Sequence, residues 1–200
     1  MTWWSDDAVA EEGQGPGAPH VDVAIVGAGF AGLGAAMALR AAGREDFVVL
    51  ERAETVGGTW RDNTYPGVAC DIPSHLYSYA EHPNPGWSRR FAPGDEIRDY
   101  LERTAAGEGV LDRVVPGAEL LDARWDAAAD CWRLATTRGP WTAGALVLAC
   151  GRLAEPRLPA VDLGGFRGPI FHSARWRHDV ELAGRRVAVV GSGASAVQLG

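Results

Sequence analysis

Residues 23–32 read VAIVGAGFAG, and this stretch decides the fold of the chain. Its four leading apolar residues predict a short strand buried on both faces. The glycines that follow, Gly27, Gly29 and Gly32, have the G-x-G-x-x-G spacing of dinucleotide-binding turns. The first allows a tight turn, the second lets the backbone approach a pyrophosphate, and the third lets helix and strand pack closely.

The residues after the turn complete a βαβ unit. An Ala- and Leu-rich segment to Ala42 predicts a helix that Gly43 ends, and Phe47–Leu50 predicts a second buried strand. Glu51 ends that strand and can accept hydrogen bonds from a ribose diol, while the helix N-terminus offers N–H groups to phosphates. The residues predicted to bind the cofactor here are Gly27, Gly29, Phe30, Ala31, Gly32, Glu51 and Arg52.

The composition indicates a soluble globular protein, because 46% of the 200 residues are hydrophobic and 22% are charged. The net charge of −7 and the lack of a basic run argue against nucleic acid. No apolar run approaches the ~20 residues that span a bilayer, and the N-terminus does not resemble a signal peptide. Cys70, Cys131 and Cys150 are widely spaced and suggest neither disulfides nor, with the histidines, a metal site. We therefore expect a cytoplasmic protein without a resident metal.

The first 20 residues and a later segment lack regular patterns. Residues 1–20 are acidic and Gly-rich and predict a disordered tail, in which Trp3 and Trp4 are either chance features or a docking contact. Residues 54–81 contain prolines and glycines that argue against any regular element, yet carry many large apolar groups. We expect an ordered loop folded over a ligand.

The centre of the chain predicts one more helix and several strands. The helix spans Pro93–Ala106, and Pro156 and Pro159 mark the exit from the domain. The predicted strands are Val114–Val115, Glu119–Trp125, Trp132–Thr136, which forms a hairpin with the strand before it, and a buried strand Ala145–Gly151.

The end of the chain repeats its beginning. Residues 187–196 match residues 23–32 at an offset of 164, with a predicted strand Val187–Val190 and with Ala196 in place of the third glycine. Such repetition implies a second nucleotide site. The chain ends four residues later, so we expect a fragment that is marginally stable and inactive by itself. The residues predicted for this second site are Gly191, Ser192, Gly193, Ala194 and Ser195.

Two further motifs resemble those of a known enzyme family. The motif Gly57-Gly58-x-Trp60, followed by Tyr65-Pro66-Gly67 and Asp71, resembles the first motif of the Baeyer–Villiger monooxygenases. The motif Phe166-x-Gly168-x3-His172-x3-Trp176 resembles the fingerprint of class B flavin-dependent monooxygenases. The family usually continues with proline or aspartate where this chain has Arg177, which leaves the subfamily open, whereas Trp176 favours the Baeyer–Villiger branch.

The resemblance implies FAD and NADPH as cofactors. Reduced flavin reacts with O2 in this family, and one oxygen atom is inserted into a ketone to give an ester or lactone. Asp71 is then the active-site carboxylate, supporting an arginine beyond Gly200, and His172 lies between the two nucleotide domains without an acid–base role. The further residues implied to contact FAD are Gly58, Thr59, Trp60, Tyr65, Asp71 and Gly151, and those of the interdomain motif are Phe166, Gly168, His172 and Trp176.

The implied fold class is α/β. Residues 21–152 form a Rossmann-like FAD-binding domain whose parallel sheet carries a β-hairpin insertion, residues 153–184 form a linker, and residues 185–200 begin a Rossmann-like NADP-binding domain. Two other interpretations stay open. The protein either oxygenates nitrogen or sulfur like sibling flavin monooxygenases, or it is a catalytically silent nucleotide-binding fragment.

Overall fold

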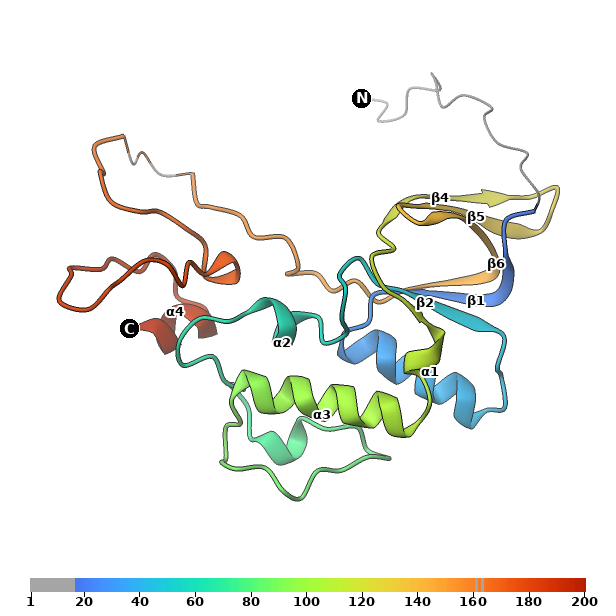
Figure 1. Cartoon of the computed structure of the whole chain (residues 1–200), viewed down its shortest axis with the longest axis horizontal. Coiled ribbons are helices and arrows are strands. Elements are labelled where there is room, and N and C mark those ends of the chain that lie inside the picture. The colour runs from blue at the N-terminus through green and yellow to red at the C-terminus, as the bar shows by residue number, and fades with distance from the viewer. Residues whose placement is uncertain (1–16, 161, 163) are drawn as a thin grey trace.

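A six-stranded sheet lies at the centre of the part of the chain that the structure describes, residues 17–160, 162 and 164–200 (Figure 1). In this computed structural model the strand order is β3-β2-β1-β6-β5-β4. The strands are β1 (His20–Val26), β2 (Phe47–Leu50), β3 (Val114–Val115), β4 (Leu120–Asp126), β5 (Cys131–Thr136) and β6 (Gly139–Leu148). Strands β3, β2, β1 and β6 are parallel, whereas β5 and β4 continue the sheet in antiparallel pairing. The predicted βαβ unit and the predicted hairpin are therefore both confirmed.

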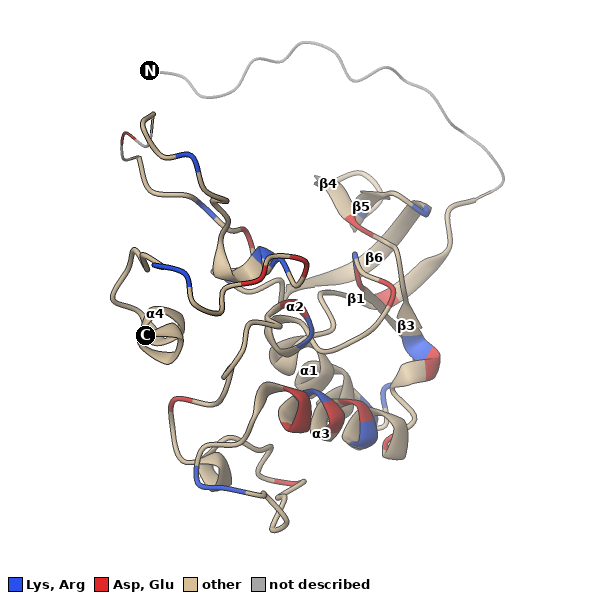
Figure 2. Cartoon of the chain, turned by 60° about the vertical axis from the view of Figure 1, so that its left-hand side comes forward, with Lys and Arg blue, Asp and Glu red and all other residues tan. Residues whose placement is uncertain are grey.

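Helices α1 (Phe30–Ala41) and α3 (Gly94–Gly107) pack against one face of the sheet. Ile97, Tyr100, Leu101 and Ala105 are spaced three or four residues apart and form the buried side of α3. Charged residues of both signs lie along the remainder of that helix (Figure 2). The shorter elements are α2 (Thr59–Asp62), α4 (Ala194–Leu199) and the 3-10 turns Ser74–Leu76, Leu111–Arg113 and Ser173–Arg175.

The apolar strands β1 and β2 supply cores on both faces of the sheet. Ile25 and Val49 contact the helices, whereas Ala24 and Val48, one position earlier, belong to the core of the opposite face. This alternation follows from the two-residue period of a strand. Residues 24–26 of β1 and all of β2 are buried on both faces, as an uninterrupted apolar run predicts.

Gly43 ends α1 as predicted. Its φ of +72° lies in the left-handed region, and its N–H donates to Arg40 O at 2.8 Å. Because glycine adopts this conformation with little steric cost, the chain can turn directly into β2.

One predicted boundary and one predicted loop require correction. His20, assigned to the tail, begins β1, and the backbone of Pro19 accepts a hydrogen bond from Thr142 N at 2.9 Å. Residues 1–16 of the predicted tail, with Trp3 and Trp4, lie outside the described residues, and residues 17–19 form no regular element. The predicted irregular loop 54–81 contains the short helix α2. Its glycines do not prevent this helix, because Gly58 lies just before it as the N-cap, with a φ of +53°.

The prediction of a buried strand over Ala145–Gly151 was wrong in its extent. Strand β6 ends at Leu148, and Leu148 is 65% exposed. The reason lies in the pairing, because β5 accompanies β6 only as far as Ala143, and the second half of β6 has β1 as its neighbour in the described sheet.

The prediction that Val187–Val190 forms a strand was also wrong. Within the described residues this segment pairs with no strand, and Val187 and Val190 are 56% and 67% exposed. An apolar sequence forms a stable strand only where neighbouring strands satisfy its backbone. The helix that follows it, α4, is formed.

Candidate nucleotide-binding site

The first glycine-rich turn connects β1 to α1 and has no room for side chains at two positions. A Cβ on Gly32 would lie 1.8 Å from the carbonyl oxygen of Gly27, and a Cβ on Gly27 would lie 2.7 Å from that of Ala149. Gly27 also has a φ of +99°. The structure therefore explains the first and third glycines by the packing of the turn itself.

Gly29, the middle glycine, occupies a different environment. An added Cβ there would meet the Gly58 Cα at 3.6 Å, which is an ordinary contact. Gly29 is the N-cap of α1, no side chain caps this helix, and its first turn contains no acidic residue. Because the first N–H groups of a helix lack intrahelical acceptors, the turn from Gly29 to Gly32, with Phe30 and Ala31, can bind an anion.

Glu51 lies next to this turn and is 3% exposed. Its Oε2 accepts a hydrogen bond from Ala28 N at 2.7 Å, and its Oε1 accepts one from Ala53 N at 2.9 Å. Arg61 Nη1 forms an ion pair with Oε1 at 3.1 Å. Since two carboxylate oxygens can accept about four hydrogen bonds, Glu51 retains one acceptor position beside the glycine turn.

The Gly57-Gly58 pair packs directly against the glycine turn. Gly57 N donates to Ala28 O at 2.9 Å, and a Cβ on Gly58 would lie 2.9 Å from the Gly29 Cα. The backbone approach explains why glycine stands in both loops. It also brings Thr59 and Trp60, the first residues of α2, close to the start of α1.

The aromatic side chains of the long loop form a cluster around the first residue of α1. Phe30 contacts the rings of Tyr77 and Tyr79 at centroid distances of 4.8 and 4.7 Å, and Tyr79 Oη donates to Phe30 O at 2.6 Å. Trp60 Nε1 donates to Tyr77 Oη at 3.2 Å. Burial raises the pKa of Tyr77 and, more strongly, that of Tyr79. These phenols are therefore neutral packing groups that fix the loop to the helix.

Asp71, the predicted active-site carboxylate, is exposed at the surface of this loop, next to Cys70, which is buried. Burial raises the pKa of the Cys70 thiol, and the negative charge of Asp71 contributes in the same direction. Cys70 is thus an unreactive core residue. All three cysteines are free.

The remaining predicted cofactor residues lie in two places. Gly151 follows β6 with a φ of +68°, beyond the Ala149 carbonyl that adjoins the glycine turn. Arg52 forms an ion pair with Glu155, at the start of the segment that leaves the sheet. The second predicted turn, Gly191-Ser192-Gly193, directly precedes α4. Helix α4 lies apart from α1, which follows the first turn (Figure 1).

The residues of the interdomain motif, Phe166, Gly168, His172 and Trp176, do not form a single cluster. His172 Nδ1 accepts a hydrogen bond from Ala174 N at 3.0 Å and so caps a 3-10 turn. The ring of Trp176 lies 6.5 Å from that of Tyr65. Phe166 is 55% exposed and packs over Gly168, where a Cβ would lie 2.8 Å from the phenyl ring.

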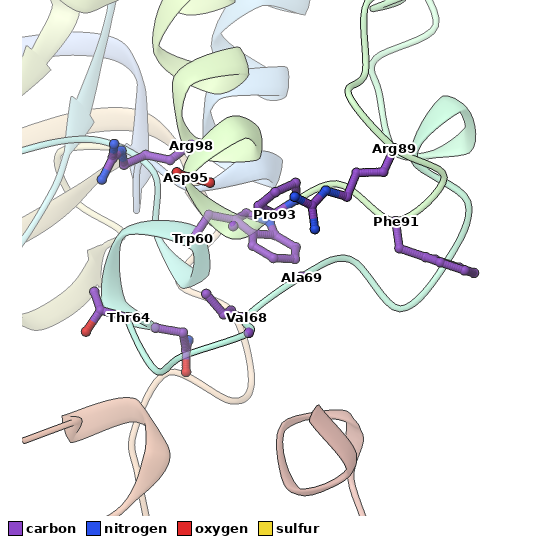
Figure 3. A pocket seen from close by; sticks show the side chains of 12 residues that line it. Trp60, Thr64, Val68, Ala69, Arg89, Phe91, Pro93, Asp95 and Arg98 are labelled. Atoms are coloured by element: carbon purple, nitrogen blue, oxygen red, sulfur yellow. The ribbon is translucent and has the colours of Figure 1, made fainter. Parts of the chain in front are cut away.

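A pocket of about 390 Å³ lies beside α2 (Figure 3), and no residue of the glycine turn lines it. Among the residues that the sequence marked as a site, Trp60 lines it. The pocket forms because Cys70 N donates to Ala92 O and Gly94 N to Val68 O, both at 2.9 Å, which joins the loop to the start of α3. Its other lining residues are Asn63, Thr64, Gly67, Val68, Ala69, Arg89, Phe91, Pro93, Gly94, Asp95 and Arg98.

Sequence reasoning missed two sets of contacting residues. Arg61 binds Glu51 because α2 turns it back toward the sheet, and no pattern announced that helix. His178 and Gln198 reach the loop from more than a hundred positions away. In the described part of the chain there is no cluster of three or more metal-ligating side chains. None of the helices described is both long and apolar enough to cross a membrane.

Comparison with known proteins identifies relatives for most of the chain. Residues 25–92 match the family model of the NAD(P)-binding Rossmann-like domain. A Baeyer–Villiger monooxygenase of Streptomyces coelicolor is 52% identical over 181 residues, and one of Pseudomonas aeruginosa is 45% identical over 183 residues. Each alignment covers 90% of this chain and 35% of the relative.

Solved structures agree with the sequence matches. A steroid monooxygenase bound to NADP superposes with a TM-score of 0.77 at 38% identity, covering 90% of this chain and 36% of that one. The OTEMO complex with FAD and NADP superposes with a TM-score of 0.80 at 31% identity, covering 92% and 36%. The chain therefore spans about a third of the length of the relatives it matches, in their N-terminal part. By its motifs, fold and sequence similarity, the chain corresponds to the N-terminal third of the members of the Baeyer–Villiger monooxygenase family.

Proposed function

We propose that the first glycine-rich turn binds FAD, within an NADPH-dependent monooxygenase that inserts one atom of O2 into a ketone to give an ester or lactone. The observation that carries this proposal is the uncapped N-terminus of α1 at Gly29, with the buried carboxylate of Glu51 beside it. Residues 21–152 are then the FAD-binding domain, residues 153–184 the linker, and residues 185–200 the beginning of the NADP-binding domain.

The residues present fit a dinucleotide. Gly29 leaves its side of the turn without a side chain, and the N–H groups of the first turn of α1 lie at the positive end of the helix dipole. The remaining acceptor position of Glu51 suits a ribose hydroxyl. Arg52, Gly58, Thr59 and Gly151 surround the same end of the sheet, as the family motif implies.

FAD, when bound, supplies the redox and oxygen chemistry, and the chain's residues position it. The turn at Gly29 orients the pyrophosphate, and Glu51 fixes the adenosine ribose. The aromatic cluster around Phe30 makes the loop between α2 and α3 rigid. The family motif implies that Asp71 lies near the reacting groups, and the proposed site of NADPH is the second turn, Gly191 to Ser195. A ketone and O2 are the proposed co-substrates.

A substitution at Gly29 tests this assignment without a packing defect. Gly29→Ala introduces one methyl group, which meets the protein at the Gly58 Cα at an ordinary 3.6 Å. The fold should persist, while the methyl group prevents the close approach of the pyrophosphate. We expect a loss of at least about tenfold in FAD affinity, measured by quenching of flavin fluorescence.

Gly107→Ala is the matched control, because an added Cβ at Gly107, the last residue of α3, has nothing within 4 Å. This variant should bind FAD like the wild type. Tighter binding of NAD⁺ than of FAD by the wild-type chain would refute the cofactor assignment.

Product analysis tests the proposed reaction class. Because the chain by itself is expected to be inactive, the test uses a protein that carries this chain within the full length of its relatives. Supplied with FAD, NADPH and O2, that protein should convert a cyclic ketone to its lactone, detected by mass spectrometry. A thioether and a tertiary amine should be offered in parallel. Formation of sulfoxide or N-oxide without lactone would contradict the Baeyer–Villiger reaction and favour the sibling monooxygenases.

A further inference from the structure

The loop after α2 contacts the C-terminal segment of the chain through hydrogen bonds and ring packing of Thr64, Tyr65 and Ala69. The partners are 111 to 133 positions apart in sequence, and α4 lies beside this loop (Figure 1). We call this contact the latch. It consists of Thr64, Tyr65 and Ala69 on the loop and of Trp176, His178, Ser195 and Gln198 on the C-terminal segment.

Tyr65 is the centre of the latch and is 4% exposed. Its hydroxyl donates to Gln198 Oε1 at 2.7 Å and is hydrogen-bonded to Ser195 Oγ at 3.1 Å. Gln198 Nε2 in turn donates to Ala69 O at 2.9 Å. Both ends of the Gln198 amide are therefore bound by the loop, which fixes the rotation of that side chain.

Two flanking contacts widen the latch. Thr64 Oγ1 is hydrogen-bonded to His178 Nε2 at 2.9 Å. The rings of Tyr65 and Trp176 lie 6.5 Å apart at an angle of 57°. The ring of Phe171 packs against that of Trp176 at a centroid distance of 5.2 Å. The loop thus holds the C-terminal segment at residues before and after the second glycine turn.

No other described feature holds the second turn as firmly. Residues 187–190 pair with no strand in the described sheet, and α4 contains no buried residue. Burial of apolar surface is what normally fixes a helix on a domain. Here the polar contacts of Tyr65 replace it.

We infer that Tyr65 is a positioning residue whose hydroxyl fixes the second glycine-rich turn, through Ser195 and Gln198, against the first βαβ unit. The family motif marks Tyr65 as a contact of FAD, but its hydroxyl is occupied by the C-terminal segment. The inference goes beyond the proposed function, because it concerns how the two glycine-rich turns are held relative to each other.

Amide hydrogen exchange of the full chain tests the latch without any cofactor. Tyr65→Phe keeps the ring and removes both hydroxyl contacts. We expect exchange over residues 191–199 to become roughly 5- to 150-fold faster, the effect of losing two ordinary hydrogen bonds, with little change over α1. Gln198→Ala should have a similar effect, because it also removes two contacts. The double variant should exchange faster than either single variant but less than the product of the two increases, because the Tyr65–Gln198 contact is lost in both.

Tyr100→Phe is a closely matched control. Tyr100 is also 4% exposed, and its hydroxyl also makes two hydrogen bonds, donating to His82 O at 2.8 Å and accepting from Tyr79 N at 2.9 Å. These contacts lie within the first unit, so Tyr100→Phe should leave exchange over residues 191–199 unchanged. Unchanged exchange there in Tyr65→Phe and Gln198→Ala, or an equal increase in every peptide, would overturn the inference.

An FAD titration of the same variants separates a latch from a cofactor ligand. This arm alone rests on the proposed function. Tyr65→Phe should bind FAD within about twofold of the wild type, because the lost contacts are to Ser195 and Gln198 and a twofold change is less than one ordinary hydrogen bond. A large loss of FAD affinity with unchanged exchange would make Tyr65 a cofactor ligand and refute the inference. If the wild-type chain bound no FAD, the proposed function would fail, and the exchange result would still decide the latch.

Discussion

Replacement of Glu51 tests the centre of the proposed site most directly. In Glu51→Ala the carboxylate that accepts hydrogen bonds from Ala28 N, Ala53 N and Arg61 disappears from a position that is 3% exposed. The two N–H groups and the guanidinium then lose their acceptor. The side chain of Arg61 is itself only 15% exposed, so water compensates it poorly.

The expected cost follows from these contacts. Removing one partner of a buried ion pair destabilises a protein by about 3–5 kcal/mol, and a buried N–H left without acceptor costs about 1–3 kcal/mol. These contributions overlap, because water can enter the space that Ala leaves. We expect the free energy of unfolding to fall by about 3–5 kcal/mol, a large share of the 5–15 kcal/mol typical of domains.

A less severe variant separates stability from binding. Glu51→Gln retains one acceptor oxygen and should cost about 1–3 kcal/mol. Arg61→Met removes the positive charge while keeping an apolar side chain of similar length. Since the two residues contact each other, the double variant should lose less than the sum of the single losses, by about 0.5–3 kcal/mol.

Urea unfolding followed by tryptophan fluorescence and circular dichroism measures these differences. FAD titration of Glu51→Gln, under conditions where it stays folded, should show a loss of about tenfold or more, because the charged acceptor of the ribose is gone. A stability loss below about 1 kcal/mol in Glu51→Ala would refute the buried ion pair. An unchanged FAD affinity in Glu51→Gln would place the ribose contact elsewhere.

Three further predictions concern other parts of the chain. Gly32→Ala, whose Cβ would lie 1.8 Å from a backbone oxygen, should cost about 3 kcal/mol or more, whereas Gly43→Ala, with open space but a φ of +72°, should cost about 1–2 kcal/mol in urea unfolding. A hydrogen bond from Arg133, across the hairpin, lowers the pKa of Asp126. The stabilisation by this ion pair is therefore present above the ordinary carboxyl pKa and is lost as the pH falls through the lowered pKa of Asp126. Asp126→Asn should remove this loss from a pH series of melting curves, and an unaltered loss would exclude the Asp126–Arg133 ion pair as its cause. Cys150 is exposed, whereas Cys70 is buried and has a raised pKa, so a thiol reagent should modify Cys150 first in the native protein. Cys150→Ser should abolish the fast phase of thiol modification, and a fast phase that persists in this variant would contradict the burial of Cys70.

Local sequence signals were sufficient for the first βαβ unit. The apolar run before Gly27, the glycine spacing and Gly43 each act within a few residues, so their pattern predicts β1, α1 and β2 without knowledge of the rest. The motif around Trp60 likewise predicts the family, since it is read directly from residue type and spacing.

Contacts between distant segments could not be read from the sequence. Arg61 reaches Glu51 only because α2 forms, and Tyr65 reaches Gln198 only because the C-terminal segment returns to the loop. The same limit explains the incorrect strand at Val187–Val190, whose apolar pattern equals that of Val23–Val26.

The residue pattern was sufficient to predict the βαβ unit, the glycine turn and the family, because turn geometry and strand alternation depend on neighbouring residues. Which apolar runs became strands depended instead on the contacts between distant segments. Val23–Val26 lies between β2 and β6 and is paired on both sides, whereas the identical pattern at Val187–Val190 meets no strand in the described part of the chain. A strand is stabilised by hydrogen bonds to its neighbours, so the same sequence pattern gives different structures where the neighbours differ.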